Sequence, residues 1–145
     1  MTTTALDRAA ILRCVPHAGA MCLLDAVTAW DATRITCRAR APDAAHPLAC
    51  DGRVHSVIAA EYAAQASAVH GALIEPHTAP RAGMLVKLSE VDLCGTAVVG
   101  PLEVRAELLT RSADACAYAF EVDDVEHGPV ARGRLMVAFT LPGRT

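Results

Sequence analysis

The chain has 145 residues and a formal net charge of -3 at pH 7, and 53% of its residues are hydrophobic although only 3% are aromatic. This length suits a single domain over residues 1–145 that buries a core without disulfides or metal, and the negative charge argues against a nucleic-acid partner. No uncharged apolar run reaches the roughly 18 residues that a membrane-spanning helix needs, so we expect no membrane association.

Two further features of the composition concern the surroundings of the protein. The mean hydropathy of +0.31 is high for a monomer, and because obligate interfaces resemble domain cores, this excess predicts a subunit interface. The six cysteines form no C-x-x-C pair, which predicts buried apolar residues in a reducing compartment. The N-terminal residues also lack the features of a signal peptide, so we expect a cytoplasmic protein.

The first forty residues predict a short helix and a β-hairpin. Residues 6–14 carry helical apolar spacing, and Pro16 ends that helix. Residues 21–30 and 34–41 are predicted to be strands joined by a turn over 31–33. The second of these strands alternates polar and apolar residues, which is typical of a strand buried on one face only.

The longest predicted element is a helix over residues 56–74, which consists mostly of alanine and other small apolar residues. Residues 42–54 contain two prolines and an Asp-Gly pair, so they predict an irregular segment leading into this helix. Ser56 is the expected N-cap, and Pro76 lies just beyond the predicted end.

The remainder of the chain predicts an antiparallel sheet. Its strand candidates are separated by short turns, which only antiparallel neighbours allow, and they cover residues 84–93, 102–111, 116–122 and 130–141. One long apolar helix combined with such a sheet predicts an α+β fold. We expect a curved sheet wrapped around the central helix, which is the hot-dog fold.

The long helix carries its polar residues in two groups. With Glu61 at 0°, Gln65 lies at about 40°, whereas Ser56, Ser67 and His70 lie at about 180° to 240°. The second group predicts a sparse outer face, with His70 at the helix surface or at an interface. Glu61 and Gln65 form a pair too small for a solvent-facing stripe.

Glu61 is the candidate catalytic acid, although a carboxylate that reaches solvent at the helix edge is an equally good interpretation of its spacing. Burial raises the pKa of a carboxyl group, and such a group can act as a general acid near neutral pH. The candidate bases are His46 and His55, which precede Glu61 by 15 and 6 positions. His17, by contrast, is expected to shape a turn.

The remaining histidines are not candidates for catalysis. His77 and His127 are expected in loops. No two histidines of the chain show i, i+4 spacing, so no metal site is predicted.

Three stretches together resemble the 3-hydroxyacyl-[acyl-carrier-protein] dehydratases of the hot-dog superfamily. They are VPHAGAMCLLDAV, HPLACDGRVHSVIAAEYAAQA, and the pair GPLEVRAELLTRS and GPVARGRLMVAFT. The resemblance covers nearly the whole chain and is nearest to the divergent branch found with aryl-polyene and pigment-type biosynthesis clusters. It departs from the family in the loop, where AAHPLACDGRVHS stands in place of G-H-F-P-G and M-P-G.

The resemblance implies that His46 removes the α proton of a 3-hydroxyacyl thioester and that Glu61 protonates the departing hydroxyl, giving a trans-2-enoyl thioester. His55 remains the alternative base because of the altered loop. Backbone N–H groups near the helix start would polarise the thioester carbonyl. Val54, His55 and Gln65 are the expected substrate-binding residues.

The resemblance also implies the partners and cofactors. No metal or redox cofactor is expected, because the substrate arrives on the phosphopantetheine of acyl carrier protein or as an acyl-CoA thioester. We expect a homodimer, with a heterodimer between two hot-dog subunits as the other possibility. An acidic carrier would dock on basic side chains, for which the candidates are Lys87, Arg105, Arg111, Arg132 and Arg134.

Two other functions fit the same residues. The first is a thioesterase, in which the helix carboxylate activates water. The second is a non-catalytic hot-dog subunit that pairs with an active dehydratase.

Overall fold

The computed structural model describes residues 5–14, 22–75 and 83–139, and within them seven strands form one antiparallel sheet. The sheet order is β1-β2-β3-β7-β8-β9-β5. Its strands are β1 (Leu6–Asp7), β2 (Ala26–Trp30), β3 (Arg34–Ala39), β5 (Gly83–Leu93), β7 (Leu102–Arg111), β8 (Ala115–Asp124) and β9 (Gly128–Phe139). A separate pair consists of β4 (Val54–His55) and β6 (Ala97–Val98).

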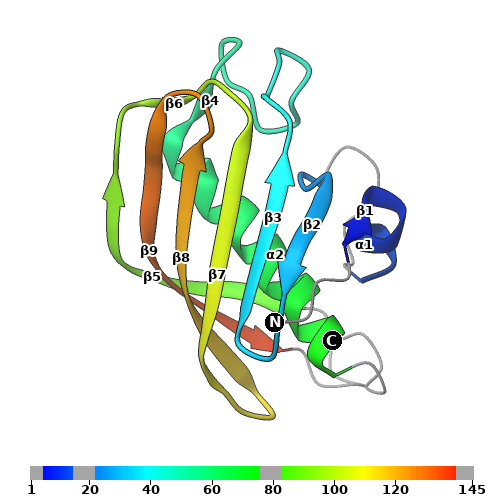
Figure 1. Ribbon diagram of the computed structural model, residues 1–145. Helices are drawn as coiled ribbons and strands as arrows, with labels where there is room; N and C mark the ends of the chain where they lie inside the picture. The colour runs from blue at the N-terminus through cyan, green and yellow to red at the C-terminus, as the bar shows by residue number, and fades with distance from the viewer. Residues whose placement is uncertain (1–4, 15–21, 76–82, 140–145) are drawn as a thin grey trace.

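The long helix α2 (Ala59–Ile74) lies across one face of this sheet (Figure 1). It packs on β3, β7, β8 and β9, and the short helix α1 (Arg8–Cys14) contacts it beside β2. The helix is mostly alanine, and side chains this small allow a helix and a sheet to approach closely. This is the predicted α+β arrangement of the hot-dog fold, with the helix at the centre and the antiparallel sheet around it.

The alternation of β7 explains why the sheet has one dry face. Leu102, Val104 and Ala106 are buried, whereas the residues between them are partly exposed. Tyr62 and other buried side chains of α2 complete the same core. The period of two residues therefore positions a continuous apolar surface for the helix.

Three of the boundaries predicted in the first forty residues differ from those observed. Residue 6 belongs to β1 and pairs with Val27, so helix α1 begins later, at Arg8, where the Asp7 carboxylate caps the N–H of Ala10. The first hairpin strand begins at Ala26, because residues 22–25 are not in a strand. The second hairpin strand ends at Ala39, two residues early.

The start of the long helix is also different from the prediction. A 3-10 turn, Ser56–Ile58, precedes α2, and the cap is His55, whose ring nitrogen accepts the N–H of Val57 at 3.0 Å. Ser56 is not the N-cap because its hydroxyl donates to the carbonyl oxygen of Gly95 at 2.9 Å. The side chain of Ser56 thereby fastens the helix start to the loop before β6.

The predicted outer polar face of the helix is wrong. Ser56, Ser67 and His70 are all buried, with at most 2% of each residue exposed. Ser67 donates to the carbonyl oxygen of Ala63, and His70 bonds across to the sheet. The sheet covers this side of the helix, so the three polar groups find partners inside the protein.

No helix in the described part of the chain is long and apolar enough to cross a membrane.

Candidate active site

A pocket of about 240 Å³ lies between the loop before β4 and the first turn of α2. Tyr62 and His46 both line it. The ring nitrogen Nε2 of His46 lies 3.0 Å from the hydroxyl oxygen of Tyr62. Tyr62 is only 1% exposed, so it forms the buried wall of the pocket.

The hydrogen bonds of His46 define which nitrogen carries its proton. Its Nδ1 accepts the backbone N–H of Leu48 at 3.1 Å, so Nδ1 holds no hydrogen. A neutral imidazole has one N–H, which is therefore on Nε2 and donates to Tyr62. Burial lowers the pKa of His46, and Asp43 opposes this only in part, which favours the neutral form. In this arrangement His46 has no free lone pair to offer a substrate.

Glu61 is oriented by the residue one turn further along α2. The side-chain amide of Gln65 donates to a carboxylate oxygen of Glu61 at 3.2 Å, and its carbonyl oxygen accepts the backbone N–H of Leu23 at 2.8 Å. Gln65 is 1% exposed, while Glu61 is half-buried. The two residues that the helical angles grouped together are thus in contact.

The structure does not bring His46 and Glu61 into contact. No hydrogen bond or ion pair joins them within the described residues, because His46 bonds instead to Tyr62, the next residue along the helix. Successive helical side chains point about 100° apart, so Glu61 points in a different direction from Tyr62, the helix residue that His46 contacts.

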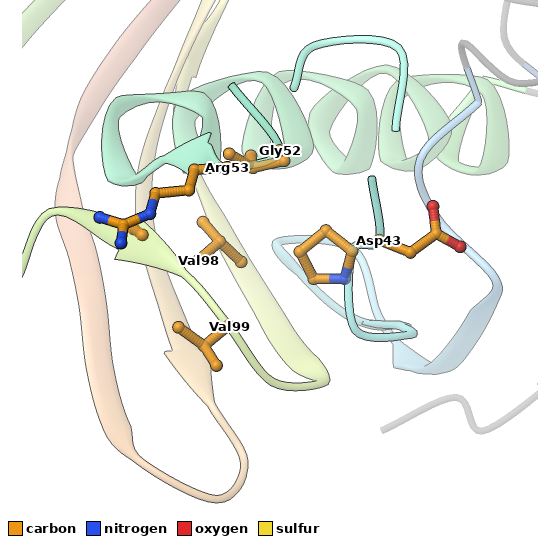
Figure 2. Close-up of a pocket in the computed structure, with 8 residues that line it drawn as sticks. Asp43, Gly52, Arg53, Val98 and Val99 are labelled. Carbon is orange, nitrogen blue, oxygen red and sulfur yellow. The ribbon is translucent and has the colours of Figure 1, made fainter. Parts of the chain in front are cut away.

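A second pocket, of about 440 Å³, lies beside the first (Figure 2). Pro42 and Asp43 line both pockets. Figure 2 shows Arg53 and Asp43 on opposite sides of the pocket, with Val98 and Val99 between them. Its other lining residues are Gly52, Val54 and Ala97. Of the expected substrate-binding residues, Val54 therefore lines a pocket.

The other two expected substrate-binding residues have structural partners. Gln65 holds Leu23 and Glu61. His55 is exposed and caps the helix start through Nδ1, so in its neutral form its Nε2 carries the proton. His55, the alternative base, thus resembles His46 in that Nδ1 accepts a backbone N–H and Nε2 carries the proton.

The backbone N–H groups expected to polarise a thioester carbonyl are largely occupied. The N–H of Ser56 donates to the carbonyl oxygen of Thr96, and that of Val57 to His55. The N–H of Ala59 donates to the carbonyl oxygens of Ser56 and Val57. These three N–H groups are therefore not available to an oxyanion in this site.

The arginines predicted to dock a carrier protein are already paired with carboxylates. The pairs are Arg105 with Glu103, Glu121 and Asp123, Arg111 with Glu75, Arg132 with Asp92, and Arg134 with Glu90. Lys87 forms no ion pair with a carboxylate of the described residues. Two arginines beside the pockets, Arg40 and Arg53, also form no ion pair with any described residue. The free positive charge near the site comes from residues that the sequence did not indicate.

One group of residues has the spacing of metal ligands, namely Asp124, Glu126 and His127. The Asp124 carboxylate accepts the backbone N–H groups of Gly100, Glu126 and His127, together with Nδ1 of His127. Burial acts to raise the pKa of Asp124, but these hydrogen bonds outweigh it and lower the pKa. The group thus clamps the β8–β9 turn to the loop before β7.

His17 and His77 lie outside the described residues.

Sequence reasoning missed Tyr62 as a member of the site. Its apolar neighbours in the helix made it look like part of the core, which it also is. The one available signal was its position next to Glu61, on the side of the helix that faces the irregular segment.

Comparisons with known proteins identify the family and the fold of the chain. The family model for ApeP-like proteins, described as ApeP dehydratase, matches residues 9–140. No curated protein gives a significant match.

Several solved structures share the fold at low sequence identity. The dehydratase heterocomplex ApeI:P from Xenorhabdus doucetiae aligns with a TM-score of 0.80 at 21% identity, over 91% of each chain. S. sahachiroi AziG aligns at 0.58 and 19% identity, over 78% of this chain and 88% of its own. A thioesterase from Haemophilus influenzae aligns at 0.59 and 11% identity, over 81% and 79%. The fold is the hot-dog fold, and by the extent of the family match the chain belongs to the ApeP-like dehydratase family.

Proposed function

We propose that this protein takes part in the dehydration of 3-hydroxyacyl thioesters, carried on the phosphopantetheine of acyl carrier protein, to trans-2-enoyl thioesters. Membership of the ApeP-like dehydratase family supports the reaction class. The observation that carries the proposal is the Gln65–Glu61 hydrogen bond, which orients a half-buried carboxylate on the central helix. In the proposed reaction, Glu61 protonates the departing 3-hydroxyl group.

We assign removal of the α proton to a base from a second hot-dog subunit. His46 was the candidate base, but its Nδ1 accepts from Leu48 and its Nε2 carries a hydrogen. A dehydratase of similar fold, ApeI:P, is a heterocomplex. A site completed by a second subunit accounts for a dehydratase chain in which both ring nitrogens of His46 are engaged within the protein.

Strand β5 is the edge on which we expect the second subunit to bind. It ends the order of the described sheet, so one side of its backbone has no neighbouring strand among the described residues. Its exposed apolar side chains are Met84, Val86, Leu88 and Leu93. Exposed apolar residues on an open sheet edge favour pairing with another chain.

The larger pocket suits the phosphopantetheine arm. Val54, Val98 and Val99 give it apolar walls, and Arg53 provides a cation that no described carboxylate pairs with. A phosphodiester at the mouth of the pocket would pair with this guanidinium. Metal and redox cofactors have no role in this scheme, because the thioester itself acidifies the α carbon.

The test is incubation with a 3-hydroxyacyl carrier protein, with the product followed by mass spectrometry. Loss of one water from the carrier-bound acyl group is the expected result, strongly enhanced when a second hot-dog subunit from the same source is added. Release of the free carrier thiol would instead identify a thioesterase. No change with or without the second subunit would refute the proposed activity.

A further inference from the structure

The hydroxyl group of Tyr62 has its oxygen engaged and its hydrogen uncommitted. His46 donates its only N–H to the Tyr62 oxygen, because its other nitrogen accepts from Leu48. The opposite direction, with Tyr62 donating to Nε2, would leave an imidazole without any hydrogen. No described residue accepts the O–H of Tyr62.

Because of where Tyr62 lies, an acceptor for its hydroxyl hydrogen would come from a molecule bound in the pocket. The residue is 1% exposed, and it lines the 240 Å³ pocket together with His46. A buried hydroxyl donor without an acceptor is unfavourable, so a ligand oxygen in the pocket would satisfy it. Burial, with a contribution from Asp25, raises the pKa of Tyr62 to about 12, so the hydrogen is present at neutral pH.

The site also needs such a donor. Removal of an α proton places negative charge on the thioester oxygen, and the backbone N–H groups of Ser56, Val57 and Ala59 are engaged elsewhere. A fixed hydroxyl in a water-poor pocket stabilises a developing oxyanion without reorganising. Tyr62 lies one residue from Glu61 on the same helix.

We propose that Tyr62 is a catalytic residue that donates a hydrogen bond to the thioester carbonyl oxygen, and that His46 is a positioning residue that holds the Tyr62 hydroxyl. This inference rests on the proposed function, since it takes an acyl thioester as the ligand of the pocket. No bond to Tyr62 forms or breaks in the reaction. The proton stays on its oxygen while Glu61 supplies the proton that leaves with the hydroxyl.

The first test is the variant Tyr62→Phe, assayed in the active assembly. We expect kcat to fall on the order of 100-fold or more with a small change in KM, which is typical when one oxyanion donor is removed. The matched control is Tyr118→Phe, which removes another buried tyrosine hydroxyl bonded to a histidine, His70. That control is expected to retain kcat. A Tyr62→Phe enzyme with full kcat would overturn the proposal.

The role of His46 is tested by comparing two replacements. Glutamine places an N–H donor near the position of Nε2, so His46→Gln is expected to recover a large part of the kcat that His46→Ala loses. A base cannot be replaced by an amide. Equal loss in both variants, with kcat restored only by histidine, would show that His46 acts as the base instead.

A third test does not depend on turnover. An acyl-pantetheine thioester without a 3-hydroxyl group, carrying ¹³C at its carbonyl, cannot be dehydrated. Its carbonyl resonance is expected to shift downfield on binding to the wild-type protein and to Tyr118→Phe, and to shift less on Tyr62→Phe. An equal shift in all three proteins, or no binding at millimolar thioester, would refute the Tyr62 contact. A normal shift without dehydration would instead refute only the proposed activity.

Discussion

Tyr118 and His70 share a buried hydrogen bond of 2.7 Å from the Tyr118 hydroxyl to Nδ1 of His70, with their rings nearly perpendicular at 89°. The direction follows from the other nitrogen, because Nε2 lies 2.8 Å from the carbonyl oxygen of Asp31, which can only accept. Arg111 lies beside the same hydroxyl and pairs with Glu75 at the end of α2. These contacts tie α2 to β8, to β7 and to the turn between β2 and β3. The hydrogen-bond directions require His70 to be neutral.

The neutral state of His70 predicts that acid destabilises the fold. Burial lowers the pKa of His70, and the nearby Asp31 carbonyl opposes this while Arg111 reinforces it. A folded-state pKa below the unfolded value means that the unfolded chain binds the proton more readily. The contribution of His70 to the free energy of unfolding is therefore fully present above about pH 6.5 and declines as the pH falls below it. Urea unfolding at pH 7.5, 6.5 and 5.5 measures this decline.

The contribution of His70 is separated from that of other groups by His70→Gln. This variant is less stable at every pH, but its free energy of unfolding should depend less on pH over this range. His46 contributes in the same direction, since burial lowers its pKa too, so part of the slope will remain. An unchanged slope in His70→Gln would show that the His70 network does not respond to acid.

Replacement of the helix acid tests the chemical proposal most directly. Glu61→Gln keeps the size of the side chain and removes the acidic proton, so dehydration should fall by about 100- to 10,000-fold. The melting temperature should change little because Glu61 is half-buried. Glu126→Gln, an exposed glutamate in the β8–β9 turn, is the control with unchanged activity. Substantial dehydration by Glu61→Gln would exclude Glu61 as the acid.

Arg53 is expected to affect the binding of carrier-bound substrate more than the chemical step. Arg53→Glu reverses a cation that lines the larger pocket and pairs with no described carboxylate, so KM for acyl carrier protein should rise by roughly 3- to 10-fold at low salt with kcat nearly constant. Added salt should reduce the difference. Arg13→Glu makes the same charge change on α1 and should leave KM unaltered. Equal effects of both variants would argue for a general charge effect.

The Asp124 clamp predicts a stability defect without a catalytic one. Asp124→Ala removes the acceptor of the buried Gly100 N–H, which lies 2.7 Å from the carboxylate. Leaving that donor unsatisfied costs about 1–3 kcal/mol, which corresponds to a melting temperature lower by roughly 3 to 10 °C. Gly100→Ala should act similarly, since a Cβ there would lie 2.5 Å from Asp124 Oδ1. Calorimetry is the measurement, and Val99→Ala, an exposed neighbour, is the control.

The open edge at β5 predicts where assembly can be disrupted. Val86→Lys places a charge on this edge and should weaken association with the second subunit by at least tenfold while the chain stays folded. Val125→Lys is a matched control, because Val125 is 52% exposed and Val86 is 50% exposed, and Val125 lies in the β8–β9 turn. Analytical ultracentrifugation compares the two. Normal assembly of Val86→Lys would exclude this edge as the interface.

Much of the fold could be predicted because its signals are local. The alternation of residues 102–111 and the alanine-rich run from residue 59 each depend only on neighbours in sequence, and both elements were confirmed. The polar faces of the helix were not predictable in this way. The assignment of His70 to the outside is wrong because its partners, Tyr118 and the Asp31 carbonyl, are 48 and 39 residues away.

In the site, too, contacts set by helical spacing could be predicted, whereas those that depend on loops or on other strands could not. The contact between Glu61 and Gln65 could be predicted from helical spacing alone. The proton arrangement of His46 could not, because it depends on one backbone N–H in an irregular loop. The ion pairs of the candidate docking arginines were not predicted either, since the carboxylates that pair with Arg105 lie on its own strand and on the neighbouring strand β8.

Gln65 has a consequence for attempts to transplant this chemistry. Its amide is held by the backbone of Leu23, 42 residues earlier in the chain, and it is this held amide that aims Glu61. A graft of the α2 sequence onto another hot-dog scaffold would carry the acid but leave behind the anchor that sets its direction. The smallest transferable unit is therefore the helix together with the backbone segment before β2.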